Sequence, residues 1–352
     1  MRYLKLLLGF LIAGLFVSCT QTPKHKLIVF AAGSLIKPFS ELESAFERAN
    51  PNIDVEMEFH GSIQVIRQVT DLDKKIDIVA TADQALIPYL MYSKTDPATG
   101  KPYAGWHIKF ASNKMALAYT SKSKYADVID QLNWQEILRK KEVIIGLADP
   151  RFDASGYRSL MILKLSEAPL DAQPLFESII TDQFKYPIRV DSGGGLSIIS
   201  IPEVLEPVPG SRIVIRGGSI QLLSLLESGN VDYAFEYESV IRQHNLKMIK
   251  LPDEINLGNP IFNDNYARVT VKLDFQRFAS LKPVFEGQTI GYGLVIPENA
   301  QNPAGAEKFI EFMYGPTGQD IMKKNFHPLI DPPIIDNPAD APQSILSLSS
   351  HE

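Results

Sequence analysis

A strand-like run that ends in Gly-Ser and leads into a helix-like run occurs twice near the amino end, and it constrains this chain more than any other pattern. The first copy ends in Gly33-Ser34 and the second in Gly61-Ser62. A helix that begins directly after a strand points free backbone N–H groups and a partial positive charge at whatever lies beyond the strand. Either pair alone could simply begin a helix without binding anything. Two pairs at equivalent places favour a small-anion site that uses both serine hydroxyls.

Strand-like and helix-like runs alternate along most of the chain. Apolar runs at residues 27–32, 55–59 and 76–80 are each followed by apolar residues at helical spacing. This βαβα order indicates an α/β fold with mainly parallel sheets flanked by helices. Ligands of such sheets gather at the carboxyl ends of the strands, which is where both Gly-Ser pairs fall.

Two segments lack this alternation. Residues 191–211 contain Gly193-Gly194-Gly195 and several prolines, and we interpret them as a long loop. Residues 331–352 are rich in Pro and Ser, which is typical of a tail that is disordered or runs along the surface.

The first residues have the pattern of a secretory signal. Arg2 and Lys5 precede an apolar stretch of about a dozen residues, which is too short to span a bilayer as a helix. The only cysteine of the chain, Cys19, lies where a bacterial lipoprotein signal would be cut. We therefore expect residues 1–18 to be removed and Cys19 to carry lipid at the start of a polar spacer, residues 19–25. The alternative is an ordinary signal peptide with a chance cysteine.

The charge balance argues against a nucleic-acid partner. The formal net charge is −6, whereas nucleic-acid binders normally carry a basic balance. Any anion site must therefore be local and made by dipoles aimed at the ligand.

Two acidic residues lie at further strand ends. Asp153 follows the strand-like run 143–147 and opens a helix, so it is either a plain N-cap or a ligand. Glu236 lies in an apolar strand, an expensive place for a charge, so it is either paired with Arg242 or the partner carboxylate of Asp153. A carboxylate repels a bound anion unless the central atom accepts extra oxygen ligands. Molybdenum and tungsten can do so, whereas phosphorus and sulfur cannot.

The sequence gives little support for catalysis. The six histidines are scattered without metal-ligand spacing, and none accompanies a nucleophile motif. The Gly-Ser pairs lack the second glycine of a nucleophile elbow, and no phosphate-binding or dinucleotide fingerprint is present. We expect no enzyme activity and no cofactor, with Trp106 and Trp134 in the core or at an interface.

Several stretches resemble one known family. From about residue 27 to residue 326, the chain resembles the tungstate/molybdate-binding solute receptors of ABC transporters, which have the two-lobed periplasmic-binding-protein (type II) fold. The stretches that carry this resemblance are 32–35, 61–62, 67–70, 123–127, 156–159, 225–229, 232–240 and 251–257.

The resemblance implies a specific ligand set. In such receptors two serines and backbone amides hold the oxyanion, while an Asp and a Glu from the other lobe add oxygen ligands to its metal. Carried over to this sequence, the oxyanion-binding residues are Ser34, Ser62, Gly156 and Tyr157, and the metal-binding residues are Asp153 and Glu236. The chain departs from its relatives at Ser155, where Cys is frequent, and at Gly217-Gly218, where Pro-Lys is usual.

The resemblance also implies the domain organisation and the partners. Residues 26–109 with 295–330 would form one lobe and residues 110–294 the other, with hinges near Phe110 and Leu294. We expect an exported, lipid-anchored monomer facing the periplasm or the cell exterior, which closes on tungstate or molybdate and docks on a permease driven by a cytoplasmic ATPase.

Two alternatives remain open at this stage. The first is a receptor of the same fold for phosphate, sulfate or ferric iron, for which Tyr157 and Tyr237 could serve as iron ligands. The second is a secreted hydrolase that uses Ser34 or Ser62, with His60 as the nearest histidine in sequence.

Overall fold

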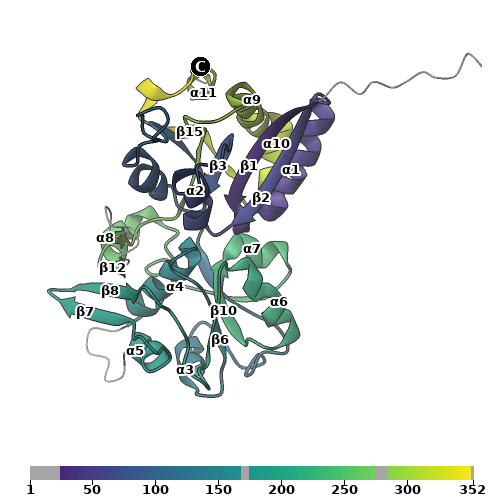
Figure 1. Ribbon diagram of the computed structural model, residues 1–352. Helices are drawn as coiled ribbons and strands as arrows, with labels where there is room; N and C mark the ends of the chain where they lie inside the picture. Colours follow the sequence, from purple (N-terminus) through teal and green to yellow (C-terminus); the bar gives the residue numbers. More distant parts are fainter. Residues whose placement is uncertain (1–23, 168–173, 275–283, 350–352) are drawn as a thin grey trace, which may run out of the picture.

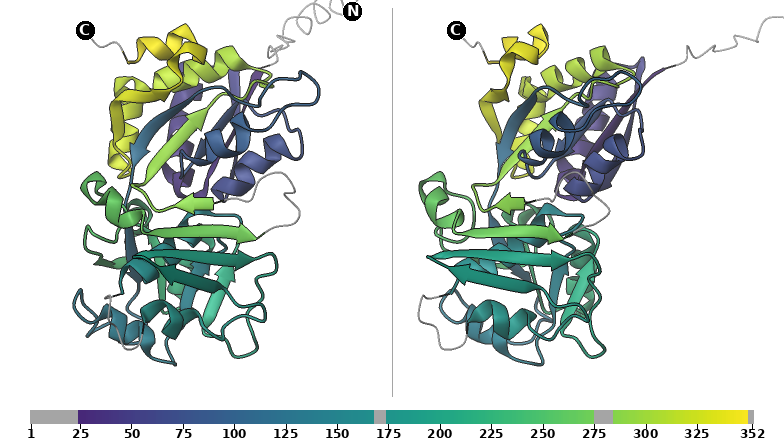
Figure 2. Two further views of the ribbon diagram at one scale, coloured as in Figure 1. Left: turned by 90° about the vertical axis from the view of Figure 1, so that its left-hand side faces the viewer. Right: turned by 60° about the vertical axis from the view of Figure 1, so that its left-hand side comes forward.

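The protein has two lobes, each built on its own β-sheet (Figure 1). The structure, a computed structural model, describes residues 24–167, 174–274 and 284–349. The predicted signal peptide and Cys19 lie outside the described residues. Figure 2 shows the lobes stacked one above the other, with the two ends of the described chain on the same lobe.

Lobe one is built on a six-stranded sheet with the order β15-β4-β14-β3-β1-β2. Its strands are β1 (His25–Ala32), β2 (Ile53–His60), β3 (Ile78–Thr81), β4 (His107–Ser112), β14 (Gly291–Val295) and β15 (Leu329–Asp336). Its helices are α1 (Ile36–Ala49), α2 (Ser62–Thr70), α9 (Pro303–Tyr314), α10 (Pro316–Lys324) and α11 (Gln343–Ser347).

Helix α1 covers this sheet because its apolar residues recur at helical spacing. Phe39, Leu42 and Phe46 are fully buried. Phe46 meets Phe309 of α9 edge-on, with ring centroids 5.1 Å apart. The first and last parts of the chain therefore share one core.

Lobe two is built on a five-stranded sheet with the order β11-β5-β10-β6-β9. Its strands are β5 (Met115–Tyr119), β6 (Ile145–Ala148), β9 (Ile213–Arg216), β10 (Tyr233–Tyr237) and β11 (Lys247–Lys250). Its helices are α3 (Trp134–Arg139), α4 (Ala154–Leu165), α5 (Leu175–Ile180), α6 (Ile220–Ser228), α7 (Glu238–Gln243) and α8 (Asn263–Tyr266). Trp106 and Trp134 are buried, in agreement with their assignment to the core.

The expectation of a long loop at residues 191–211 is wrong for the first half of that segment. Strands β7 (Arg189–Gly193) and β8 (Leu196–Pro202) form a hairpin there, joined by Gly194 and Gly195 at φ of 60° and 82°. Only glycine adopts this left-handed backbone freely, so the glycines make a tight turn instead of a loop. The hairpin joins β12 (Val269–Asp274) and β13 (Val284–Glu286) in a third sheet of four strands.

The α/β two-lobed fold is confirmed, but the two main sheets are mixed instead of mainly parallel. Strand β1 pairs in parallel with β2 and β3, whereas β14 and β15 run antiparallel to their neighbours. The chain passes between the two sheets at Asn113-Lys114 and again at residues 287–290. Phe110 and Leu294, where the sequence placed the hinges, lie inside strands β4 and β14.

Of the two expectations for residues 331–352, disorder is wrong for residues 331–349, and this part of the chain instead lies along lobe one. Strand β15 pairs with β4 at the edge of the lobe-one sheet, and its two prolines lie where the register shifts. Proline is tolerated at such places because it needs no ladder partner for its nitrogen. Helix α11 then packs on α9 and buries Ile345 completely.

We expect Ile345→Ala to lower the free energy of unfolding by about 2 kcal/mol, because the substitution leaves a cavity between α11 and α9. Urea denaturation followed by circular dichroism measures this change. The control is Ile334→Ala on β15, whose side chain is 55% exposed and whose loss should change little. Equal, negligible effects of both substitutions would contradict the packing of the tail.

A candidate solute site between the lobes

The two Gly-Ser pairs lie side by side at one end of the lobe-one sheet. Strands β1 and β2 are parallel neighbours, and their last residues, Ala32 and His60, are paired in register. Ser34 therefore lies in the short 3-10 turn Gly33–Leu35, beside Ser62, which begins α2. The sequence prediction of adjacent helix starts is confirmed.

Lobe two approaches this end of the sheet very closely. The carbonyl oxygen of Phe152 accepts hydrogen bonds from the amides of Ile63 and Gln64, at 3.1 and 3.4 Å. A Cβ atom on Gly61 would lie 2.3 Å from the same oxygen. Gly61 is thus required by the contact between the lobes, and two amides of α2 are committed to that contact.

Both serine hydroxyls accept a hydrogen bond from a fixed donor. Tyr292 Oη donates to Ser34 Oγ at 2.9 Å, and the amide of Ala82 donates to Ser62 Oγ at 2.9 Å. Since each oxygen is already an acceptor, its own hydrogen is free to point elsewhere. Ser34 and Ser62 are both buried, so the geometry suits donation to a ligand enclosed between the lobes.

Asp153 is the N-cap of α4, as one interpretation of the sequence expected. Its Oδ1 accepts from the amide of Ser155 at 2.8 Å, and its Oδ2 accepts from the amide of Ser219 at 3.1 Å. Burial raises the pKa of Asp153, although these hydrogen bonds oppose the rise. The cap joins two elements of lobe two at the cleft, because Ser219 directly precedes α6.

Glu236 lies at the end of β10 and is not paired with Arg242. Arg242 lies 3.6 Å from Glu238 instead, and it stacks on Phe326. Glu236 Oε1 accepts from the amide of Tyr237 at 2.7 Å, while Oε2 is buried without a partner among the described residues. Burial raises the pKa of Glu236 to about 8. The amide of Tyr237 and the side chain of Ser219 oppose the rise, and the neighbouring Asp153 adds to it.

The groups of Gly156 and Tyr157 have other partners in this structure. The amide of Gly156 donates to the carbonyl oxygen of Asp153 at 3.1 Å. The hydroxyl of Tyr157 donates to Asp83 of lobe one, and its ring stacks on Phe285. A role for Gly156 and Tyr157 in oxyanion binding stays a prediction.

Two charged residues beside the candidate site, Arg158 and Asp83, were not predicted from the sequence. They lie on different lobes, and Arg158 Nη2 is 3.1 Å from Asp83 Oδ2. Although burial alone would lower the pKa of Arg158, Tyr237 and Asp83 hold the guanidinium charged and the pKa is raised. The one available signal was the position of Asp83, directly after strand β3 at the ligand-binding end of the sheet.

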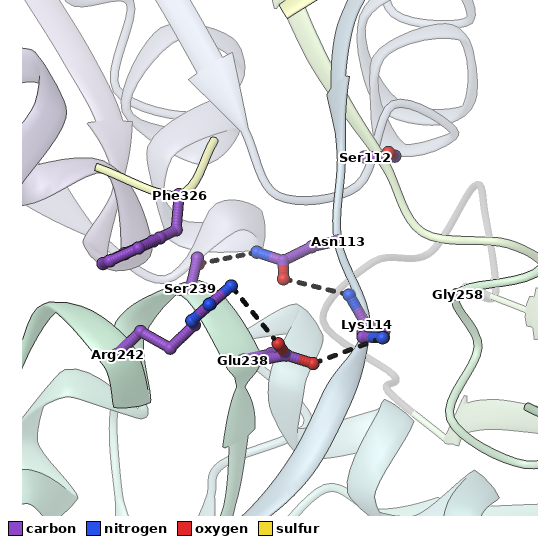
Figure 3. A pocket seen from close by; sticks show the side chains of 8 residues that line it. All are labelled: Ser112, Asn113, Lys114, Glu238, Ser239, Arg242, Gly258 and Phe326. Carbon is purple, nitrogen blue, oxygen red and sulfur yellow. Dashed lines mark hydrogen bonds and ion pairs between the residues drawn. The ribbon is translucent and has the colours of Figure 1, made fainter. Parts of the chain in front are cut away.

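Figure 3 shows the first crossing between the lobes, where Asn113 faces Ser239. Asn113 Nδ2 donates to Ser239 of lobe two at 2.8 Å and to Tyr292, the partner of Ser34, at 3.2 Å. Beside it lies a cavity of about 200 Å³, lined by residues that include Glu238 and Lys114, whose charged groups are 3.3 Å apart. The crossing is therefore tied by hydrogen bonds to one of the candidate ligand serines.

The described residues do not support hydrolase chemistry at the serines. In the part of the chain that the structure describes, neither serine has a histidine among its hydrogen-bond partners, and His60 pairs with Glu58 at 3.1 Å. Over the same residues, no group of three or more His, Cys, Asp or Glu side chains is placed to hold a metal ion. No helix within the described ranges is long and apolar enough to cross a membrane.

A family model described as bacterial extracellular solute-binding protein matches residues 27–326. The chain belongs to this family. The resemblance seen in the sequence is thereby confirmed, and the family is one of exported binding proteins and not of enzymes.

Similar proteins cover most of the chain. A "Molybdate/tungstate-binding protein WtpA" from Pyrococcus abyssi is 37% identical, with 88% of this chain and 86% of that protein covered. A protein of the same description from Thermococcus kodakarensis is 36% identical, with 90% and 85% covered. An uncharacterised solute-binding protein from Staphylothermus marinus is 35% identical, with 91% and 88% covered.

Solved structures support the fold alone. The periplasmic molybdate-binding protein of Azotobacter vinelandii has a TM-score of 0.53 at 16% identity and covers 86% of this chain and 99% of its own. The sulfate-binding protein SubI of Mycobacterium tuberculosis has a TM-score of 0.54 at 12% identity, with 88% of each chain covered. Since the two have similar scores and different named ligands, fold similarity does not choose the solute.

We expect Gly61→Ala to weaken solute binding at least tenfold, because the new methyl group would clash with Phe152 when the lobes meet. Isothermal titration of the variant and the wild type with the solute measures the loss. Gly217→Ala is the matched control, since the nearest atom to its new Cβ would be 3.8 Å away. A variant that binds like the wild type would show that this close approach does not matter for binding.

Proposed function

We propose that this protein is an extracytoplasmic receptor that captures tungstate or molybdate between its lobes and delivers it to an ABC transporter permease with a cytoplasmic ATPase. The observation that carries the proposal is the buried pair of carboxyls, Asp153 and Glu236, on lobe two, opposite the serines of lobe one. Two relatives named as molybdate/tungstate-binding proteins support it at 36% and 37% identity.

The serines would hold the oxyanion by its oxygens. Ser34 and Ser62 each keep a hydroxyl hydrogen to donate, because their oxygens accept from Tyr292 and Ala82. Hydrogen bonds from neutral donors suit an anion in a chain of net charge −6, since they act locally.

The carboxyls would bind the metal centre instead of the oxygens. Glu236 Oε2 has no partner among the described residues, so it is free to act as a ligand. Asp153 is fixed by the amides of Ser155 and Ser219, which orient it without neutralising it. Molybdenum and tungsten accept such extra oxygen ligands, whereas the centres of sulfate and phosphate are saturated.

The iron alternative is less well supported by the same contacts. Tyr157 and Tyr237 would be the phenolate ligands, but Tyr157 donates to Asp83 and Tyr237 accepts from Arg158. Both hydroxyls have a pKa held well above the ordinary value, chiefly by burial, which disfavours the phenolate.

Lipid anchoring at Cys19 and a monomeric state are part of the proposal. The anchor rests on the sequence of the signal region, which lies outside the described residues. The lipid would hold the receptor at the membrane surface near its permease.

Titration of the signal-free protein with tungstate, molybdate, sulfate and phosphate at neutral pH tests the choice of solute. We expect tight one-to-one binding of the first two anions only. Binding of sulfate or phosphate instead would mean that Asp153 and Glu236 are structural.

We expect Glu236→Gln to weaken tungstate and molybdate binding at least 100-fold, because a neutral amide is a poor ligand for a hard metal centre. Weak sulfate binding should change by less than about threefold, since sulfate gains nothing from the carboxylate. Competition titration of both anions gives the two ratios. Glu238→Gln is the control, since the carboxylate of Glu238 pairs with Lys114 and Arg242 and with none of the proposed ligand residues that the structure describes. Equal losses for all anions in Glu236→Gln would contradict coordination by the carboxylate.

We expect proton release when tungstate binds below pH 8. The raised pKa of about 8 keeps Glu236 protonated in the closed, ligand-free pocket, and coordination needs its carboxylate. Affinity should therefore rise with pH up to about 8 and then level off. Titrations in two buffers of different ionisation enthalpy count the protons released. In Glu236→Gln the count should fall, and an unchanged count would assign the proton to another group.

A further inference from the structure

A buried ion pair joins the two lobes at the edge of the site. Arg158 lies on α4 of lobe two and is 2% exposed, and Asp83 follows β3 of lobe one and is 5% exposed. Arg158 Nη2 is 3.1 Å from Asp83 Oδ2, and Arg158 Nη1 donates to the carbonyl oxygen of Ala82 at 2.7 Å. Tyr157 adds a second hydrogen bond to Asp83 from lobe two.

Arg158 is linked to a candidate ligand residue on each lobe through one intervening residue. On lobe one its partner Ala82 donates its amide to Ser62 Oγ. On lobe two Arg158 Nη1 donates to Tyr237 Oη at 2.7 Å, and the amide of Tyr237 donates to Glu236. Arg158 thus sets the position of an oxyanion-binding residue relative to a metal-binding residue.

We propose that Arg158 is a positioning residue whose ion pair with Asp83, the interlobe latch, holds the receptor closed on its solute. This inference rests on the proposed function for the ligand residues it aligns. The latch contacts no solute itself, so its effect falls on closure and on the rate of release.

Its strength follows from burial. When the lobes meet, both charges are desolvated, and each is stable there only with the other. Removal of one partner leaves an unpaired charge buried in the closed state, whereas in the open state that charge is hydrated and costs little. A latch of this kind slows dissociation and leaves the encounter with the solute unchanged.

Asp83→Asn is the cleanest variant. The amide keeps the shape of the side chain and its acceptor for the amide of Ala85, which lies 3.1 Å from Asp83 Oδ1, while the charge is lost. Arg158→Lys is the second variant, because lysine keeps the charge but cannot reach Ala82, Asp83 and Tyr237 at once.

Dissociation is followed by loading the signal-free protein with sodium tungstate, removing free anion by rapid gel filtration, and measuring retained tungsten over time. We expect Asp83→Asn and Arg158→Lys to release tungstate about 30-fold faster than the wild type, with association rates unchanged within about threefold. Small-angle scattering of the loaded variants should give a larger radius of gyration than the loaded wild type.

The matched control is an ion pair within one lobe. Lys124 Nζ lies 2.9 Å from the buried Asp232, and both residues belong to lobe two. Lys124→Gln should lower the melting temperature of ligand-free and loaded protein alike and leave tungstate release unchanged. Asp83→Asn should instead keep the melting temperature of the ligand-free protein within about 2 °C of the wild type. It should reduce only the rise in melting temperature that tungstate binding produces.

Unchanged release from both latch variants, or equal destabilisation of ligand-free and loaded Asp83→Asn, would overturn the inference. The wild-type titration keeps this failure separate from failure of the proposed function. If the wild type binds sulfate or phosphate and not tungstate, the proposed solute is wrong, and the same rate ratio is measured with the anion that binds.

Discussion

The rest of the site depends on two carboxyl groups that lobe two buries without a cation of their own. Asp153 begins α4 after β6, and Glu236 lies near the end of β10. Because β6 and β10 are parallel neighbours, the sheet order brings the two groups to the same end of lobe two. A buried carboxylate is costly unless it is hydrogen-bonded or bound to a cation. Backbone amides supply part of that compensation, and the nearest guanidinium, Arg158, is held by Asp83. Under the proposed function, the positively polarised metal centre of the bound anion would complete the compensation.

On lobe one, uncharged hydrogen-bond donors connect the candidate site to the crossings between the lobes. Tyr292 lies on β14, just after the second crossing, and it links Asn113 of the first crossing to Ser34. His327 packs edge-on against the Tyr292 ring, and burial lowers its pKa to about 4, so it is neutral at physiological pH. A change in the angle between the lobes would therefore shift the hydrogen-bond partner of Ser34, one of the candidate ligand serines.

Much of this arrangement could be predicted from local sequence. The Gly-Ser pairs and Asp153 lie where a strand is followed by a helix. The strand-like and helix-like patterns of apolar residues can each be recognised over a few residues. The isolated Glu236 in an apolar strand was also informative, because burial of a charge needs a reason. These signals are local, and they placed the candidate ligands correctly at strand ends on both lobes.

What the sequence could not predict depends on long-range pairing. Asp83 and Arg158 look like ordinary surface charges until the lobes meet, and nothing local marks Tyr292 as the partner of Ser34. The hairpin of β7 and β8 was missed because its glycines indicate a turn and a loop equally well. The last strand was missed because prolines argue against a strand, although edge strands and bulges tolerate them.

The connectivity of the lobes has a consequence for the order in which they can form. Lobe two is continuous in sequence from Met115 through β13. Lobe one is not, because β14 lies between β3 and β4 in its sheet, and β15 pairs with the other edge of β4. As the chain emerges from its amino end, lobe two can close its core first. The lobe that opens the sequence is then the last to be completed. Until the carboxyl-terminal strands arrive, β3 and β4 each keep exposed edges, which makes the incomplete protein a natural client for chaperones.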